Sequence, residues 1–237
     1  MAIRAVAFDI GGVLEITPDT GMTEKWEQRL HLKPGELDQR MASVWRDGSL
    51  GKCSEEQVQQ SLKEMIGMDQ AQVDAFLHDL WEEYLGTLNV ELATYFSSLR
   101  PRYQTAIISN SFVGARTREQ ERYRFDEMTD LIIYSHEVGI AKPDRRIYEL
   151  TCERLGVQPA EMIFLDDHER PLAAARELGI HAILFQNTAQ AIADVQAELR
   201  ARSSRLKANM QAAAQRSSWS ALAKKGASRS VACASPL

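Results

Sequence analysis

Near its N-terminus the chain reads Ala5-Val6-Ala7-Phe8-Asp9-Ile10-Gly11-Gly12-Val13-Leu14. The apolar run ends at one carboxylate, Asp9, and two glycines follow a residue later. This short run with its Gly-Gly stop favours a buried strand of a parallel sheet. Ligands of open α/β sheets bind beyond the carboxyl ends of the strands, which makes Asp9 a candidate functional group. An aspartate that only caps a turn would give the same local pattern.

Bulk composition indicates an ordinary globular protein. The chain has 237 residues, 44% of them hydrophobic and 26% charged, which suits one domain with an insertion. Its three cysteines are far apart and lack metal-ligand spacing, as expected in a reducing compartment. The first apolar stretch is too short for a signal peptide, and no later run could span a membrane. We therefore expect a cytoplasmic protein.

Charge divides the chain into two parts. Seven of the 28 basic side chains lie in residues 201–237, which hold no acidic one, so the first 200 residues carry 21 basic and 33 acidic groups. This acidic main body argues against a nucleic-acid-binding protein. The tail, 201–237, has too little apolar content to offset its ordering entropy, which predicts disorder. A basic helix that touches an anionic surface or partner is the alternative.

Residues 16–88 read as an all-helical insert. Two capping boxes, Ser54 with Gln57 and Asp69 with Gln72, precede apolar stripes at helical spacing. The second stripe, which includes Trp81, is the most regular, and we interpret its aromatic residues as core. The glycines from 48 to 51 predict a turn.

Four more apolar runs follow, at 105–108, 131–134, 162–165 and 182–185. Helical patterns near 89–99, 114–122, 144–155 and 171–178 separate or precede them, and Pro171 suits the first position of the last helix. Alternating strands and helices predict an α/β fold with a doubly wound, parallel, five-stranded sheet. Its core would comprise residues 1–15 and 89–200, with 16–88 as a helical cap.

Polar groups stand at the predicted strand ends. They are Asp9 after the first strand, Ser109 and Asn110 after the second, Lys142 in a later loop, and Asp166 with Asp167 after the fourth. Carboxylates from two strands suit Mg²⁺, and a hydroxyl, an amide and an ammonium beside it could hold phosphate. A carboxylate can also act as the nucleophile of aspartyl-phosphate chemistry. Taken singly, each group is equally consistent with a helix cap, a turn or a solvated loop.

In their order along the chain these motifs resemble the haloacid dehalogenase superfamily, whose members are mostly phosphatases. The resemblance covers nearly all of residues 3–198, and the insert looks like the family's small helical cap of type C1. The motifs are Phe8-Asp9-Ile10-Gly11-Gly12-Val13-Leu14, Ile107-Ile108-Ser109-Asn110-Ser111, Glu137 to Asp144, and Phe164-Leu165-Asp166-Asp167 followed by Ala173 to Ile180.

The resemblance implies roles for seven residues. Asp9 would be the nucleophile and a metal ligand, the Gly11 carbonyl and Asp166 would be further Mg²⁺ ligands, and Asp167 would assist. Ser109 and the Asn110 amide would hold phosphate oxygens. Lys142 would neutralise charge on Asp9 and on the transferring group, since two anions approach each other only when screened.

Two positions depart from the family pattern. Most phosphatases of the family have a second aspartate, a general acid/base, where this chain has Gly11. Some members with glycine there look like sugar-phosphate phosphatases. Glu15, Asp19, His136 and His168 are candidate substitutes, although each also reads as an ordinary surface residue. Pro171 stands where relatives often have asparagine, which leaves a further metal contact open.

Three functions follow as hypotheses. The first is an Mg²⁺-dependent phosphatase of a small phosphorylated metabolite, such as a sugar phosphate, working through an aspartyl-phosphate. The second is a catalytically silent phosphate-binding or regulatory module that lost turnover with the missing aspartate. The third is a carbon–halogen hydrolase that uses Asp9 without metal. The identity of the substrate and the oligomeric state do not follow from the sequence.

Overall fold

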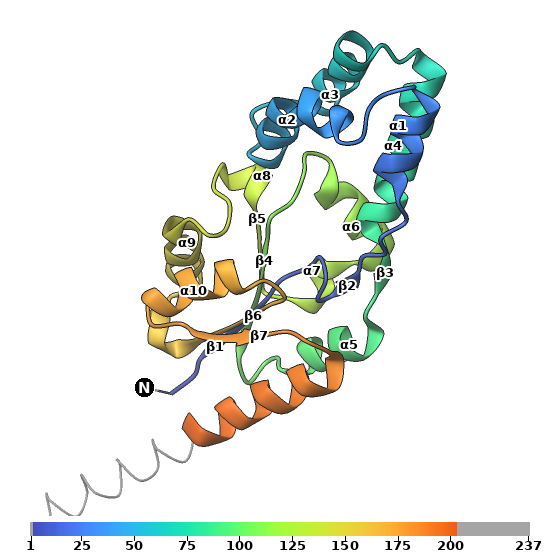
Figure 1. The fold of residues 1–237 in the computed structure, drawn as a ribbon. Helices are drawn as coiled ribbons and strands as arrows, with labels where there is room; N and C mark the ends of the chain where they lie inside the picture. The colour runs from blue at the N-terminus through green and yellow to red at the C-terminus, as the bar shows by residue number, and fades with distance from the viewer. Residues whose placement is uncertain (1, 203–237) are drawn as a thin grey trace, which may run out of the picture.

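A computed structural model describes residues 2–202 of the chain, and the predicted tail, 201–237, lies outside these residues except for its first two. Five parallel strands form the main sheet in the order β5-β4-β1-β6-β7 (Figure 1). Their bounds are β1 Ala5–Phe8, β4 Gln104–Ser109, β5 Leu131–Tyr134, β6 Met162–Asp166 and β7 His181–Leu184. The predicted α/β fold with a five-stranded parallel sheet is therefore confirmed.

Helices cover both faces of the sheet. On one face lie α5 (Val90–Ser98), α7 (Phe125–Met128) and the helical residues 188–202, which contribute apolar side chains to one buried cluster. On the other face lie α9 (Arg145–Leu155) and α10 (Glu169–Glu177), which pack on a second cluster. Strand β1 is completely buried between β4 and β6, which explains its uninterrupted apolar sequence.

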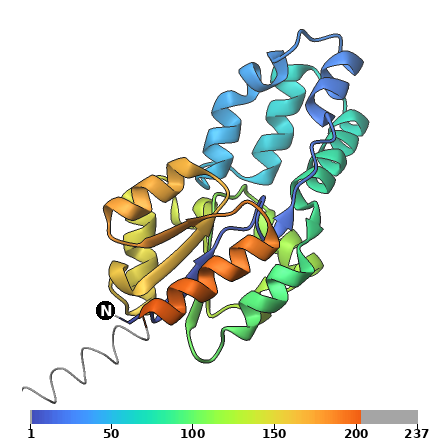
Figure 2. The same cartoon turned by 60° about the horizontal axis from the view of Figure 1, so that its bottom comes forward.

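The insert has its own apolar core. Its helices are α1 (Met22–Arg29), α2 (Glu36–Ser49), α3 (Glu55–Ser61), the π-helix η1 (Leu62–Ile66) and α4 (Gln70–Leu85). Both predicted capping boxes are present, at the starts of α3 and α4. The insert stands over one end of the sheet, where α2 contacts the short helix α8 (Ser135–Val138) (Figures 1 and 2).

A two-stranded sheet joins the insert to the main sheet. The chain leaves through β2 (Glu15–Ile16) and returns through β3 (Thr87–Leu88), and these strands pair antiparallel. Such paired linkers support residues 16–88 as a separate cap, and we keep these bounds as a proposal.

Two local predictions need correction. Gly48 lies inside α2, which ends at Ser49, so the turn predicted at 48–51 is present only at Leu50 and Gly51. Phe112 packs so closely against Gly48 that an added Cβ would lie 2.2 Å from that ring. Helix α10 begins at Glu169, so Pro171 is its third residue, not its first. Proline is tolerated there because the first four amides of a helix have no partner within it. The elements not yet named are α6 (Ala115–Tyr123) and η2 (Pro159–Glu161). Within residues 2–202, no helix is long and apolar enough to span a membrane.

Candidate active site

Three adjacent strands place polar groups at one edge of the sheet. Ser109 is the last residue of β4, Asp9 follows β1, and Asp166 is the last residue of β6. Because β1 lies between β4 and β6 with Phe8 opposite Ile107 and Leu165, these strand ends coincide. The predicted convergence of these groups is therefore observed.

Lys142 lies between the two carboxylates. Its Nζ atom is 2.8 Å from Asp9 Oδ2 and 2.7 Å from Asp166 Oδ2, and its side chain is 2% exposed. Asn110 fixes the lysine backbone, because its Oδ1 accepts from the Lys142 amide at 2.7 Å and its Nδ2 donates to the Lys142 carbonyl at 2.9 Å. A buried ammonium is stable only when it is paired, so these contacts explain why Lys142 is buried.

Each carboxylate is held by the backbone through its other oxygen. The Ile10 amide donates to Asp9 Oδ1, and the His168 amide donates to Asp166 Oδ1, both at 2.8 Å. Burial raises the pKa of Asp9 to about 7, because Lys142 opposes this effect only in part and the Asp166 charge adds to it. Two buried carboxylates share one ammonium, so a bound cation would offset the remaining negative charge.

Asp167 stands at the edge of this site and contacts Gly12 closely. A Cβ on Gly12 would lie 2.2 Å from Asp167 Oδ2, and Gly12 has φ +72°, so only glycine fits. The carboxylates of Asp166 and Asp167 and a ring nitrogen of His168 lie within 4.8 Å of one another. Carboxylate oxygens dominate this set of donors, and they fit Mg²⁺ better than a soft metal.

A cleft of about 550 Å³ contains these groups. Asp9, Lys142, Asp166 and Asp167 line it, together with Gly11 and Asn110. Ser109 is 2% exposed and is not among the described residues that line this cleft. Of the seven predicted site residues, the structure therefore brings six to one cleft. The seventh, Ser109, is buried and directly precedes Asn110 in the chain.

The four candidate substitutes for the missing aspartate lie in different surroundings. Glu15 is buried, and burial raises its pKa to about 9. Asp19 is exposed. His136 is hydrogen-bonded through Nδ1 to Ser111 Oγ at 2.6 Å. Only His168, which pairs with Asp167 at 2.6 Å, lines the cleft.

Sequence reasoning missed a group of buried acids near Asp9. Glu119 is completely buried and accepts a hydrogen bond from the Tyr134 hydroxyl, while its Oε1 atom has no hydrogen-bond partner. Burial raises the pKa of Glu119 to about 7, and the charges of Glu119 and Asp9 raise that of Glu15. Glu119 lies in a strongly charged segment, Arg116 to Arg122, whose pattern suggests an exposed helix, so no local signal could have revealed its burial.

Comparison with known proteins identifies relatives. A family model described as haloacid dehalogenase-like hydrolase matches residues 3–179. Acyl-CoA dehydrogenase family member 10 of Mus musculus is 30% identical over 208 residues, which are 83% of this chain but 19% of that protein. The bifunctional epoxide hydrolase 2 of Sus scrofa is 26% identical over 83% of this chain and 39% of its own length. The chain thus spans only about a fifth to two fifths of these two relatives.

Two smaller relatives have different activities. D-ribitol-5-phosphate phosphatase of Bacteroides thetaiotaomicron is 22% identical over 79% of this chain and 94% of its own. (S)-2-haloacid dehalogenase 1 of a Pseudomonas species is 27% identical over 77% and 76%. Among solved structures, a haloacid dehalogenase family enzyme of Bacteroides thetaiotaomicron in complex with magnesium and inorganic phosphate matches with a TM-score of 0.66. It is 22% identical and covers 78% of this chain and 95% of its own, a likeness that concerns the fold.

Proposed function

Because this chain belongs to the haloacid dehalogenase-like hydrolase family, we propose that it is a magnesium-dependent phosphatase of a small phosphorylated compound. The observation that carries the proposal is the position of Lys142, within 2.8 Å of Asp9 and 2.7 Å of Asp166 at the ends of adjacent strands. A nucleophile, a cation for the phosphoryl group and a set of hard-oxygen metal donors then share one cleft.

The donors suit one Mg²⁺ ion. Asp9, Asp166 and the Gly11 carbonyl would hold the ion. Asp167, which lies against Gly12, would assist by binding Mg²⁺ directly or through a water molecule. Bound there, Mg²⁺ would neutralise charge on the phosphoryl oxygens and on the nucleophile. The relatives support this assignment, because one is a sugar-alcohol phosphatase and a structural neighbour was crystallised with magnesium and phosphate.

The protein's own groups would divide the chemistry between them. An Asp9 oxygen attacks phosphorus, the bond from phosphorus to the alcohol oxygen breaks, and that oxygen leaves with the electron pair. Water then attacks the aspartyl-phosphate at phosphorus, which releases inorganic phosphate and restores Asp9. Lys142 offsets the negative charge that gathers as the two anions approach. Asn110 acts indirectly, because it holds the Lys142 backbone.

Two rival functions remain to be separated by experiment. The haloacid dehalogenase relative supports a carbon–halogen hydrolase. Against it, three carboxylates line the cleft with two cationic side chains, Lys142 and Arg170, so a carboxylate-bearing haloacid would meet net negative charge without a divalent cation. The absence of an acidic side chain at Gly11 supports a silent phosphate-binding module, because a general acid/base contributes about 10²–10⁴-fold to the rate.

Turnover assays on phosphate monoesters and on a 2-haloacid, with melting curves recorded in phosphate, separate all three. We expect inorganic phosphate to be released over many turnovers with Mg²⁺, and release to stop with EDTA or in Asp9→Asn. Phosphate release that is equal in wild type and Asp9→Asn would contradict the proposal. Stabilisation by phosphate without turnover would indicate the silent module, and metal-independent halide release would indicate the dehalogenase.

A further inference from the structure

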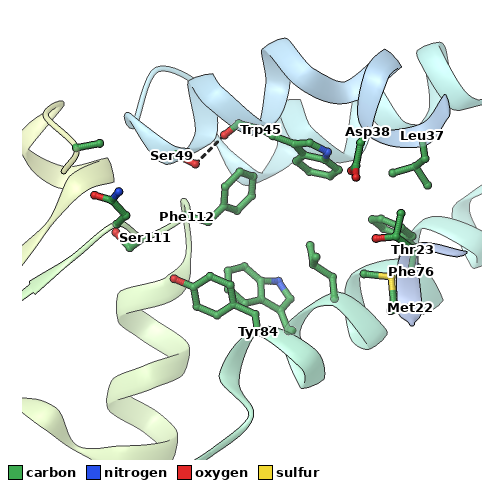
Figure 3. Close-up of a pocket in the computed structure, with 14 residues that line it drawn as sticks. Met22, Thr23, Leu37, Asp38, Trp45, Ser49, Phe76, Tyr84, Ser111 and Phe112 are labelled. Atoms are coloured by element: carbon green, nitrogen blue, oxygen red, sulfur yellow. Dashed lines mark hydrogen bonds between the residues drawn. The ribbon is translucent and has the colours of Figure 1, made fainter. Parts of the chain in front are cut away.

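A second cavity, of about 370 Å³, lies between the helical insert and the end of the sheet (Figure 3). Helices α1, α2 and α4 form its walls on one side, and the segment after β4 forms the other. Phe112 lies between two indoles of the insert, with ring centroids 5.7 Å from Trp45 and 6.4 Å from Trp81. Phe76 and Leu80 extend this apolar surface.

The cavity adjoins the candidate active site. Asn110, which holds Lys142 in place, lines both this cavity and the cleft with Asp9. Ala141, directly before Lys142, also lines the cavity. A phosphate bound beside Lys142 would therefore lie next to the aromatic cavity.

Polar groups near this entrance already have partners within the protein. Ser111 Oγ is bonded to His136 Nδ1 at 2.6 Å, Ser49 Oγ donates to the Trp45 carbonyl at 2.8 Å, and both ends of the Asn110 amide bind Lys142. The other polar side chains are Tyr84, on the α4 side, and Thr23 with Asp38 at the opposite end (Figure 3). Most of the remaining lining is apolar, so a sugar or polyol with several hydroxyl groups would leave some of them without partners, which is costly.

Gly11 adds an independent constraint on the leaving group. It lines the cleft at the position that would supply a general acid, and glycine has no proton to give. A phenolic oxygen, with a pKa near 10 as in tyrosine, can depart largely unprotonated, whereas an alkoxide is far more basic.

We propose that the substrate is an aryl phosphate monoester, whose aromatic ring occupies the cavity between Trp45, Trp81 and Phe112. This inference rests on the proposed phosphatase function and specifies its substrate class. In the first step Asp9 takes the phosphoryl group, and the phenolate leaves with the electron pair of the broken P–O bond and collects a proton from water. The cavity binds the ring, and the low basicity of the phenolate replaces the missing acid.

A binding experiment tests the cavity without turnover. The full chain is titrated with benzylphosphonate, in which a CH₂ group replaces the ester oxygen, and with methylphosphonate, both with Mg²⁺, while tryptophan emission is recorded. Because two indoles line the cavity, we expect benzylphosphonate to change the emission and to bind about tenfold or more tightly than methylphosphonate.

Two matched variants on α4 locate the binding site. Leu80 and Leu77 both pack on the core of the insert, but only Leu80 lines the cavity. Leu80→Gln should weaken benzylphosphonate binding, and Leu77→Gln should leave it unchanged, with melting curves recorded for both. Equal affinity for the two phosphonates, or equal effects of the two variants, would overturn the inference.

Turnover then separates the inference from the function on which it rests. We expect wild type to hydrolyse phenyl phosphate with a higher kcat/KM than hexyl phosphate, and hexyl phosphate in turn with a higher value than glycerol phosphate. Asp9-dependent hydrolysis that prefers glycerol phosphate would overturn the aryl assignment and leave the phosphatase intact. Selective benzylphosphonate binding that depends on Leu80, without hydrolysis of any ester, would support the aryl site and contradict the phosphatase.

Discussion

A substitution at Gly11 tests whether the missing general acid limits hydrolysis when the leaving group is a basic alcohol oxygen. A Cβ at this residue would have Thr17 Oγ1 as its nearest neighbour, at 4.0 Å, and Gly11 has no positive φ. Gly11 and Thr17 both line the cleft, so an added side chain would have open space there. We therefore expect Gly11→Asp to fold normally and to place a carboxyl group beside the site.

The expected gain depends on the leaving group. A general acid contributes about 10²–10⁴-fold when a basic oxygen must be protonated as it departs. Gly11→Asp should therefore raise kcat for hexyl phosphate by about that range at most, and raise kcat for phenyl phosphate much less. Phosphate release measured at saturating substrate and Mg²⁺ gives both values.

Controls separate acid catalysis from a change of shape. Gly11→Ala adds only the Cβ, and Gly11→Asn adds a side chain of the same shape without the acid, so neither should accelerate hexyl phosphate. If folded, Mg²⁺-binding Gly11→Asp hydrolyses hexyl phosphate no faster than Gly11→Asn, the missing acid does not limit the reaction and the reasoning is refuted.

Three further changes test the surrounding structure. Lys142→Met leaves two buried carboxylates without their ammonium, so the free energy of unfolding of the metal-free protein, measured in urea, should fall by about 3–5 kcal/mol. Added Mg²⁺ should restore part of this loss, and an unchanged unfolding midpoint without metal would contradict the prediction. Gly12→Ala puts a Cβ at φ +72°, 2.2 Å from Asp167 Oδ2, so it should weaken Mg²⁺ binding in calorimetry, whereas Gly11→Ala should not. Burial raises the pKa of Glu119 from 4.5 to about 7, so the folded state holds the proton more tightly and stability should fall as pH rises from about 4.5 to 7. Between pH 5 and 8, the free energy of unfolding in urea should fall by about 3 kcal/mol less for Glu119→Gln than for wild type. Equal decreases in the two proteins would show that Glu119 does not titrate in this range.

The sequence was most informative where local chemistry and strand order agree. The strand that ends before Asp9, the run that ends at Ser109 and the run that ends at Asp166 were each recognisable by apolar content and a polar stop. Parallel pairing then brings their ends together whatever the intervening residues are. That rule sufficed to predict that Asp9, Lys142 and Asp166, up to 157 positions apart in the chain, converge at one edge of the sheet, whereas the role of Lys142 beside Asp9 came from the family resemblance.

Features that depend on side-chain packing between elements could not be predicted in this way. Trp81 was correctly expected to be buried, at 8% exposure, but its stripe could not show that this residue also lines a cavity. Gly48 was assigned to a turn because nothing near it in the sequence shows that Phe112, 64 residues later, packs against it. Both residues belong to the contact between the insert and the sheet. If the insert selects the substrate, the motifs that indicate the reaction type carry no information about the leaving group, and only the packing of the insert against the sheet does.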